Sequence, residues 1–386
     1  MAEKVTLGFI GCGGMAGAHV AGLKILWDAG LRDFEVVATC DIEQAKAQQF
    51  SDDIAEWQGT TPRVYADYEV MLKNESDMMA VDIVTLHRNH HIITNACFEA
   101  GKHVTIEKPI AITLRAGKKM LDDNAKAGTV FQVAENYRRD EPSRAIKWAV
   151  TSGLIGDLRQ IYWMDVEERL WYWTWRDHVM QAGGGWPLDG GVHFADLFTY
   201  HVGYPETIYS AVRTYNPKRY TDPENMQGPI DVDVEDTTLA ILTFPNGVVG
   251  QWTYSLAAPG TKFSQRVLYG DDGSIDFHNG YKSRKEEWTM EQLVARHHEA
   301  IGPDEMEKLF PRGIKDTIAT ELHEFFQAVL TGGTVEVDGL QGFRAEAISI
   351  SLYESQELGR PVTLKEMENL ELETYQNRIN DGLEGL

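Results

Sequence analysis

Residues 5–16 read VTLGFIGCGGMA, a short apolar run followed at once by a cluster of glycines. The run from Val5 to Ile10 is typical of a buried strand, and the segment from Met15 to Trp27 predicts a helix. The turn between them has the pattern GxGxxA and consists of Gly11, Cys12, Gly13, Gly14, Met15 and Ala16. In such a turn the first glycine permits a tight bend, the second lets the backbone approach a pyrophosphate, and the alanine keeps the helix close to the sheet. The stretch therefore predicts a dinucleotide site at the start of a parallel sheet.

A carboxylate at the end of the second predicted strand, FEVVATC at 34–40, supports the same site. Asp41 directly follows this strand, where a carboxylate can bind the two hydroxyls of an adenosine ribose. The same charge would repel the 2'-phosphate of NADP, and Ile42 and Glu43 offer no group that grips a phosphate. We therefore expect NAD as the cofactor. Its expected contacts at this end are Gly11, Gly13, Gly14, Met15, Ala16, Asp41 and Ile42.

The pattern of strands and helices divides the chain into two predicted domains. In the first third, β-branched runs alternate with helical patterns, which predicts βαβ units on a parallel sheet. We expect residues 1–137 to form an α/β Rossmann domain with a doubly wound parallel sheet. Longer alternating runs follow at 159–170, 237–244, 248–256 and 263–270. They predict an α+β domain over 138–386, with a large, mostly antiparallel open sheet, and the polar stretches 216–228 and 282–312 are expected to be insertions or loops.

Composition excludes several classes of partner. The 386 residues include 36 Lys and Arg against 59 Asp and Glu, a net charge of -23 that repels nucleic-acid backbones and anionic membranes. We therefore expect no nucleic-acid or membrane partner. The three cysteines, Cys12, Cys40 and Cys97, match neither a disulfide framework nor a zinc pattern. With no leader pattern at the N-terminus and no long apolar run, we expect a protein of the reducing cytoplasm.

A second motif gives the chain a resemblance to a known family. The segment AGKHVTIEKP, from Ala100 to Pro109, resembles the AGKHVxxEKP signature of the glucose-fructose oxidoreductase, inositol dehydrogenase and MocA family, abbreviated Gfo/Idh/MocA. Further blocks resemble this family in the same order, among them GGGWPLDGGVHFAD at 183–196, GDDGS at 270–274 and YES at 353–355. The resemblance implies an NAD-dependent oxidoreductase that acts on a CH–OH group of a carbohydrate. It also implies a homo-oligomer, a dimer or a tetramer, built through the sheet of the second domain.

The resemblance carries the catalytic residues of the family over to Lys108, Asp189 and His193. Asp189 and His193 lie four residues apart on an expected helix, so we expect them to share one face. Removal of a hydride from a secondary alcohol requires a base for the hydroxyl proton, and an imidazole with an unperturbed pKa near about 6.5 suits that task. Asp189 would stabilise the imidazolium or hold the substrate, and Lys108 would stabilise the developing alkoxide. The resemblance also implies a cis peptide before Pro109.

One segment departs from the family pattern. Where the family commonly has Thr-Pro-Asn with a histidine shortly after, this chain has Thr85, Leu86, His87, and then His90. The contacts expected at the nicotinamide end of the cofactor are Thr85, His87, His90, Glu107 and Lys108. The run of histidines does not predict a metal site, because no acidic partner lies at ligand spacing.

Residues 162–178, YWMDVEERLWYWTWRDH, are much richer in aromatic residues than the rest of the chain. Indole faces can stack on pyranose rings, and the charged residues between them can bind ring hydroxyls. Large aromatic residues also fill cores and interfaces, and the sequence leaves that alternative open. The predicted substrate contacts are Tyr137, Trp173, Trp175, Arg176, His178, Asp189 and His193.

Together these features predict a dehydrogenase that oxidises a secondary hydroxyl of a sugar, a glycoside or a cyclitol, with the 3-hydroxyl of a glucoside as one candidate. Two alternatives remain open on the same scaffold. A glycosidase that oxidises the ring transiently and retains its NAD would release an aglycone without net NADH. A non-catalytic NAD-binding sensor is the second, although the presence of Lys108, Asp189 and His193 together argues against it.

Overall fold

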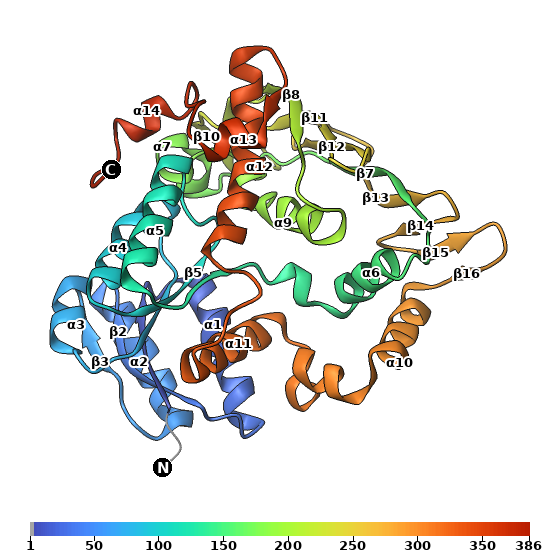
Figure 1. Cartoon of the computed structure of the whole chain (residues 1–386). Coiled ribbons are helices and arrows are strands. Elements are labelled where there is room, and N and C mark those ends of the chain that lie inside the picture. Colours follow the sequence, from blue (N-terminus) through green and yellow to red (C-terminus); the bar gives the residue numbers. More distant parts are fainter. Residues whose placement is uncertain (1–3) are drawn as a thin grey trace.

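The computed structural model describes residues 4–386 and contains a six-stranded sheet, a nine-stranded sheet and a separate two-stranded hairpin (Figure 1). The six-stranded sheet lies in the N-terminal third of the chain and the nine-stranded sheet in the remainder. This arrangement confirms the predicted combination of a Rossmann domain with a second domain that is built on a large sheet.

The six-stranded sheet is parallel throughout, in the order β3-β2-β1-β4-β5-β6. Its strands are β1 (Val5–Ile10), β2 (Phe34–Cys40), β3 (Arg63–Tyr65), β4 (Ala80–Ile83), β5 (His103–Glu107) and β6 (Phe131–Ala134). The order reverses between β1 and β4, and ligands of doubly wound sheets bind beside the carboxyl ends of the strands at such a switch point. This edge of the sheet is therefore the first place to look for a cofactor site.

Helices from both ends of the chain cover this sheet. The connecting helices are α1 (Gly14–Asp28), α2 (Gln44–Gln58), α3 (Tyr68–Asn74), α4 (His90–Glu99) and α5 (Leu114–Ala127), with the short 3-10 helix η1 (His87–Asn89) before α4. Two late helices return to the same domain: α11 (Thr317–Thr331) packs on α1, and α12 (Gly339–Leu358) packs on α5 and β6 (Figure 1). The domain boundary at residue 137 stays a prediction, because these helices join the two parts.

The nine-stranded sheet has the order β16-β15-β14-β13-β7-β12-β11-β8-β17. Its strands are β7 (Leu158–Val166), β8 (Thr207–Arg213), β11 (Thr237–Thr243), β12 (Val249–Ser255), β13 (Phe263–Gly270), β14 (Gly273–Asp276), β15 (Gly280–Ser283), β16 (Glu287–Trp288) and β17 (Val362–Thr363). β7 and β12 pair in parallel, and the other neighbours pair antiparallel. The prediction of a large, mostly antiparallel sheet is confirmed.

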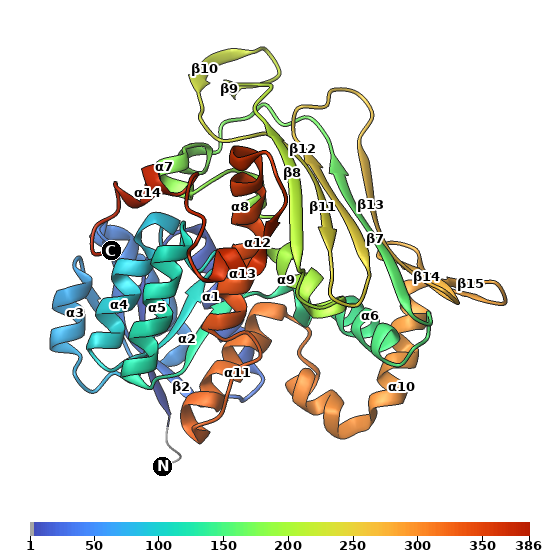
Figure 2. The ribbon, with the colours of Figure 1, turned by 45° about the horizontal axis from the view of Figure 1, so that its top comes forward.

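The two faces of the nine-stranded sheet have different environments. On the inner face, Trp163 and Trp252 are buried against Phe198 of α9 (Val192–His201), with ring centroids 5.3 Å apart in both pairs. In Figure 2, α9, α12 and α13 (Leu364–Glu368) lie on the side of the sheet that faces the Rossmann helices. The opposite, outer face carries exposed apolar side chains, including Leu239 and Ile241. Only the inner face can therefore contribute to a site shared with the Rossmann domain.

Two stretches expected to be insertions or loops contain regular structure. Residues 216–228 include β9 (Lys218–Asp222) and the start of β10 (Gln227–Asp231), which form the separate hairpin. Residues 282–312 include β16 and α10 (Met290–Leu309), whose first turn is closed by a capping box between Thr289 and Gln292. Their polar composition reflects exposure to solvent rather than a lack of hydrogen-bonded structure.

Short helices complete the fold around the site and at the chain end. They are α6 (Glu141–Thr151), α7 (Val179–Ala182), α8 (Trp186–Asp189) and α14 (Asn377–Asn380). The C-terminal segment is tied to the rest by buried bonds, including one from the Tyr375 hydroxyl to the Gly183 carbonyl at 2.8 Å. Among residues 4–386, no helix has the length and apolar character needed to cross a bilayer.

Candidate active site

The glycine turn after β1 has the geometry of a phosphate cradle. Gly11 has φ of 93°, and a Cβ there would lie 2.1 Å from the Val84 carbonyl oxygen, so only glycine fits. At Gly13 and Gly14 a Cβ would meet nothing within 4 Å, and both residues are exposed beside Met15, whereas Ala16 is buried. The N-terminus of α1 has neither a side-chain cap nor an acidic residue in its first turn. Its free amide groups and the helix dipole therefore favour a bound pyrophosphate.

Asp41 is held in place before any ligand binds. Its two carboxylate oxygens accept hydrogen bonds from the backbone amides of Cys12 and Glu43, each at 2.8 Å. Ile42 beside it is 91% exposed and offers an apolar surface. A fixed carboxylate next to the glycine turn suits the ribose of NAD. The residues of this end thus fit the cofactor predicted from the sequence.

Glu107, predicted to lie at the nicotinamide end, belongs to a buried network. Its Oε1 lies 3.0 Å from His19 Nε2, and its Oε2 accepts the backbone N–H of Lys108 at 3.1 Å. The other nitrogen of His19 lies 2.8 Å from Asp82 Oδ2. Burial opposes a charge on His19, but the two carboxylates outweigh it and raise the pKa of His19 well above its usual 6.5. Glu107 therefore supports the Lys108 backbone, while its carboxylate is engaged by His19.

The segment that departs from the family pattern contains His87 and His90, which lie where the two domains meet. His90 is buried and bonds the Pro109 carbonyl at 2.8 Å and the Thr85 carbonyl at 3.3 Å, and burial lowers its pKa to about 4. The peptide between Lys108 and Pro109 is cis, as the resemblance implied. His87 is also buried, with Nε2 3.4 Å from Asp189 Oδ1, and burial lowers its pKa well below 6.5. His90 thus supports the backbone of the EKP segment, and His87 contacts a predicted catalytic residue.

The expectation that Asp189 and His193 share one helix is wrong. α8 ends at Asp189 and α9 begins at Val192, with Gly190 and Gly191 between them. A Cβ would lie 2.5 Å from the Trp186 ring at Gly190 and 2.7 Å from Pro187 Cα at Gly191, so the chain turns too tightly here for larger residues. Their spacing of four residues therefore does not place these two side chains one above the other on a helix.

Lys108 links the groups of the site. Its Nζ donates to the backbone carbonyl of Asp189 at 2.9 Å, and its positive charge acts on both His87 and Glu135. The Asp189 side chain accepts a bond from Arg176 Nε at 3.1 Å on the same oxygen that faces His87. Asp189 is thereby held between a cation and a neutral imidazole, with its second oxygen left to bind a ligand.

His193 has a carboxylate partner that sequence reasoning missed. Its Nδ1 lies 2.5 Å from Oε2 of Glu135, which is fully buried at the end of β6. Within residues 4–386, no hydrogen-bond partner faces the other ring nitrogen, Nε2. The Tyr137 ring stacks on the imidazole, with centroids 3.9 Å apart and planes 6° apart. Burial raises the pKa of Glu135 above its ordinary range, although His193 opposes that effect. The imidazole is therefore fixed in orientation, with one nitrogen free to exchange a proton.

Only some side chains of the aromatic segment 162–178 lie at the candidate site. Trp173 stacks on Trp186 at 6.0 Å, and Trp175 packs edge-on against His87 at 4.6 Å. Arg176 lies over both indoles and bonds Asp189. His178 instead bonds the Tyr172 hydroxyl at 3.0 Å and is not among the side chains that contact Asp189 or His193. Trp173, Trp175 and Arg176 thus border the site, as does Tyr137.

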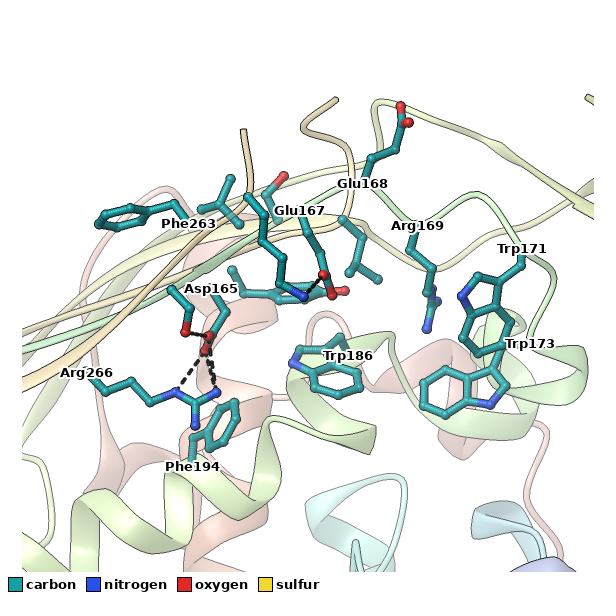
Figure 3. Close-up of a pocket in the computed structure, with 16 residues that line it drawn as sticks. Asp165, Glu167, Glu168, Arg169, Trp171, Trp173, Trp186, Phe194, Phe263 and Arg266 are labelled. Atoms are coloured by element: carbon teal, nitrogen blue, oxygen red, sulfur yellow. Dashed lines mark hydrogen bonds and ion pairs between the residues drawn. The ribbon is translucent and has the colours of Figure 1, made fainter. Parts of the chain in front are cut away.

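A cavity of about 490 Å³ adjoins these residues on the inner face of the large sheet (Figure 3). It is lined by Trp173 and Trp186 together with Asp165, Phe194 and Arg266, none of the last three predicted as contacts from the sequence. Asp165 and Arg266 belong to neighbouring strands, which their long-range pairing brings together. The alternating pattern of RQIYWMDVEERL could have predicted the position of Asp165, because alternation places Asp165 on the same face of β7 as Ile161 and Trp163.

Comparisons with known proteins agree with this geometry. Residues 5–135 match the family described as "Oxidoreductase family, NAD-binding Rossmann fold", and residues 147–364 match its C-terminal alpha/beta domain. A levoglucosan dehydrogenase of Pseudarthrobacter phenanthrenivorans is 28% identical, over 92% of this chain and 96% of the relative. A D-glucoside 3-dehydrogenase of Escherichia coli is 25% identical, over 86% of this chain and 91% of the relative. The solved structure of a levoglucosan dehydrogenase in complex with NADH and L-sorbose has a TM-score of 0.75 at 23% identity, over 94% and 99% of the two chains, and shows the shared fold.

Proposed function

The chain belongs to the Gfo/Idh/MocA family of NAD-binding oxidoreductases, and on that premise we propose that it oxidises a secondary hydroxyl of a pyranose sugar or glycoside. The observation that carries the proposal is His193, whose imidazole is fixed by Glu135 and has no hydrogen-bond partner at Nε2 within residues 4–386, while the charge of Lys108 acts on the same Glu135. The names of relatives that act on levoglucosan and on D-glucosides support a carbohydrate substrate. A ring hydroxyl at carbon 3 is the candidate position.

In the proposed reaction the substrate hydroxyl lies between His193 and Lys108. His193 Nε2 takes the hydroxyl proton while the C–H bond breaks and the carbonyl forms. NAD, held by the glycine turn and Asp41, would supply the nicotinamide ring that accepts the hydride. Lys108 donates to the reacting oxygen and stabilises its developing negative charge, and Asp189 accepts a bond from a neighbouring hydroxyl. The buried carboxylate of Glu135 stabilises the imidazolium that results.

The experiment is a screen of pyranosides, cyclitols and acyclic polyols for NADH formation. The proposal expects NADH to accumulate with one or more pyranosides and much less with acyclic polyols, since a rigid ring matches an indole face without loss of chain entropy. Release of an aglycone without net NADH would replace it with the transient-oxidation glycosidase. Binding of NAD with no turnover on any of these substrates would favour the sensor.

We also propose that NAD is preferred over NADP. Asp41 is held by two backbone amides, so it cannot easily move away from a 2'-phosphate. Asp41→Ala should weaken NAD binding by roughly tenfold to a hundredfold, because a hydrogen bond to a charged group is lost. Calorimetry with both cofactors is the measurement, and an unchanged ratio of the two affinities in the variant would remove the argument.

We propose further that two copies associate through the outer face of the large sheet, as a dimer or within a tetramer. Five of its apolar side chains are exposed over neighbouring strands: Tyr209, Leu239, Ile241, Val249 and Tyr269. An exposed apolar patch of this kind is typical of an interface. Light scattering should give a multiple of 43.5 kDa that Ile241→Lys lowers, whereas a single 43.5 kDa particle for the unaltered chain would exclude the proposal.

A cytoplasmic location is part of the same proposal. Cys12, Cys40 and Cys97 are buried free thiols, as is common in proteins of reducing compartments. Fractionation of the native cells should find the protein with cytoplasmic markers, and recovery with exported proteins would contradict it.

A further inference from the structure

The cavity on the inner face of the sheet extends away from the catalytic groups. Phe194 lines it and directly follows His193, and Trp186 lines it from the same short helix as Asp189. Figure 3 shows Trp171 at one end of it, with 44% of this residue exposed. Its volume of about 490 Å³ lies within the range of small-molecule sites, roughly 300–1,000 Å³. The cavity therefore lies next to the site: Trp173, which lines it, packs under Arg176, and Arg176 bonds Asp189.

Aromatic side chains form one wall of this cavity. Trp173, Trp186 and Tyr254 make a continuous stack, with centroids 6.0 Å and 5.7 Å apart and planes 29° and 21° apart. Trp171 extends the series by an edge contact with Trp173 at 5.4 Å. The faces of Trp186 are covered by its two neighbours in the stack, so a ligand meets the edges of these rings and the indole of Trp171, which is 44% exposed. The stack is rigid, so a ring-shaped ligand can pack against it at little cost in side-chain entropy.

The charged groups of the cavity are already paired with one another. Arg266 and Asp165 form a bidentate contact, and Lys262 pairs with Glu167. Arg169 lies over Trp171 and Trp173 and bonds Asp177. Glu168 also lines the cavity and has no ion-pair partner within residues 4–386, but Figure 3 shows its carboxylate pointing away from the other lining residues. A ligand here therefore meets paired charges and finds polar atoms along the edge of an aromatic wall. Such a lining suits a neutral ring that carries hydroxyl groups or an aromatic face.

We propose that this cavity is a subsite for a second ring, so that the substrate is a two-ring glycoside whose sugar is oxidised at His193. The second ring, a sugar or an aryl aglycone, lies against the wall of Trp173 and Trp186 and reaches Trp171. The proposal rests on the proposed function, since it assigns the part of the substrate that does not react. It adds a preference for extended substrates that the catalytic groups alone do not create.

The test compares methyl glucoside with phenyl glucoside and a glucosyl glucoside, each as both anomers. We expect kcat/KM to be at least about tenfold higher for one of the two-ring compounds, through stacking contacts. Trp171→Ala should reduce that preference, with a larger loss for the two-ring compound than for the methyl glucoside. Tyr215→Ala, which removes an exposed ring outside the cavity, is the matched control and should leave the ratio unchanged. The phenyl and glucosyl arms distinguish an aryl aglycone from a second sugar.

Direct binding separates this proposal from the proposed function. Calorimetry on the NAD-loaded protein should show tighter binding of the two-ring compound than of methyl glucoside, and weaker binding in Trp171→Ala. Oxidation of methyl glucoside without a two-ring preference would overturn the subsite and leave the dehydrogenase function intact. Selective binding without NADH formation would support the subsite and contradict the dehydrogenase function. Equal binding of the two-ring compound by the unaltered protein and by Trp171→Ala would overturn the subsite.

Discussion

His19 and His193 are both buried beside carboxylates, and they differ in which ring nitrogens remain free. His19 of α1 uses both nitrogens, one with Asp82 at 2.8 Å and the other with Glu107 at 3.0 Å, and it has no exposed surface. His193 of α9 uses only Nδ1, with Glu135, and its ring is 7% exposed. A carboxylate beside a buried histidine is therefore not in itself a mark of catalysis. In the proposed function, the free nitrogen is what allows His193 to exchange a proton with a substrate.

The largest effect is expected when the free nitrogen or its neighbouring cation is removed. His193→Ala and Lys108→Ala should each lower kcat by roughly 10²–10⁴-fold, as expected for loss of a general base or of an electrostatic partner. NAD affinity should survive in His193→Ala, because the cofactor contacts lie elsewhere. Steady-state NADH formation measures kcat, and near-normal turnover in His193→Ala would make Asp189 the better candidate for the base.

The next largest effect concerns stability rather than turnover. His19→Asn leaves Asp82 and Glu107 buried without their cation, which should cost roughly 3–5 kcal/mol of unfolding free energy. Because the pKa of His19 is raised on folding, its contribution is complete below its usual value of 6.5 and is lost as the pH rises through the higher folded value. Denaturant unfolding across pH should therefore show the gap between unaltered protein and variant narrowing at alkaline pH. A gap that widens with pH would contradict this assignment.

A smaller effect is expected from the carboxylate of the catalytic pair. Glu135→Gln keeps the shape but removes the charge that stabilises an imidazolium, so kcat should fall by about tenfold to a hundredfold. Because the pKa of Glu135 is raised, the activity of the unaltered enzyme should decline on acidification at a pH above the ordinary pKa range of a glutamate. That acidic limb should be absent from the pH profile of the variant. Glu135→Asp is the control that keeps the charge, and an identical profile in all three proteins would show that Glu135 has only a packing role.

The smallest effect concerns the ring that covers His193. Tyr137→Ala should lower kcat by about twofold to tenfold through loss of the stacked face, whereas Tyr137→Phe keeps the stack. Comparison of kcat with KM in the two variants separates orientation of the base from substrate binding. If Tyr137→Phe raised KM as much as Tyr137→Ala, the hydroxyl would be a substrate contact and the stack would be incidental.

The cofactor site at the glycine turn could be predicted from the sequence because backbone geometry determines which residues fit there. Gly11 is required by a positive φ and by the Val84 carbonyl 2.1 Å from any Cβ, and Asp41 follows its strand directly. These constraints are local, so the pattern GxGxxA and the position of one carboxylate were enough to expect the fold and NAD. The identity of Lys108, Asp189 and His193 came from the resemblance and not from spacing.

The catalytic pair was not predictable in the same way, because it joins residues 58 positions apart. Glu135 lies at the carboxyl end of β6, and an acid at that edge of a parallel sheet was the only signal. The proposed spacing argument for Asp189 and His193 failed at Gly190 and Gly191, and two consecutive glycines are a known signal for a helix break. The cavity depended on strand pairing that no local pattern specifies.

The most direct test of the difference between the two histidines compares the variants His19→Asn and His193→Asn. The quantity to measure is the single-turnover rate of NADH formation per folded molecule. With saturating NAD and an oxidisable pyranoside, the account predicts a rate close to that of the unaltered protein for His19→Asn. It predicts a rate lower by roughly 10²–10⁴-fold for His193→Asn. Equal rates in the two variants, or a deeper loss in folded His19→Asn, would contradict it.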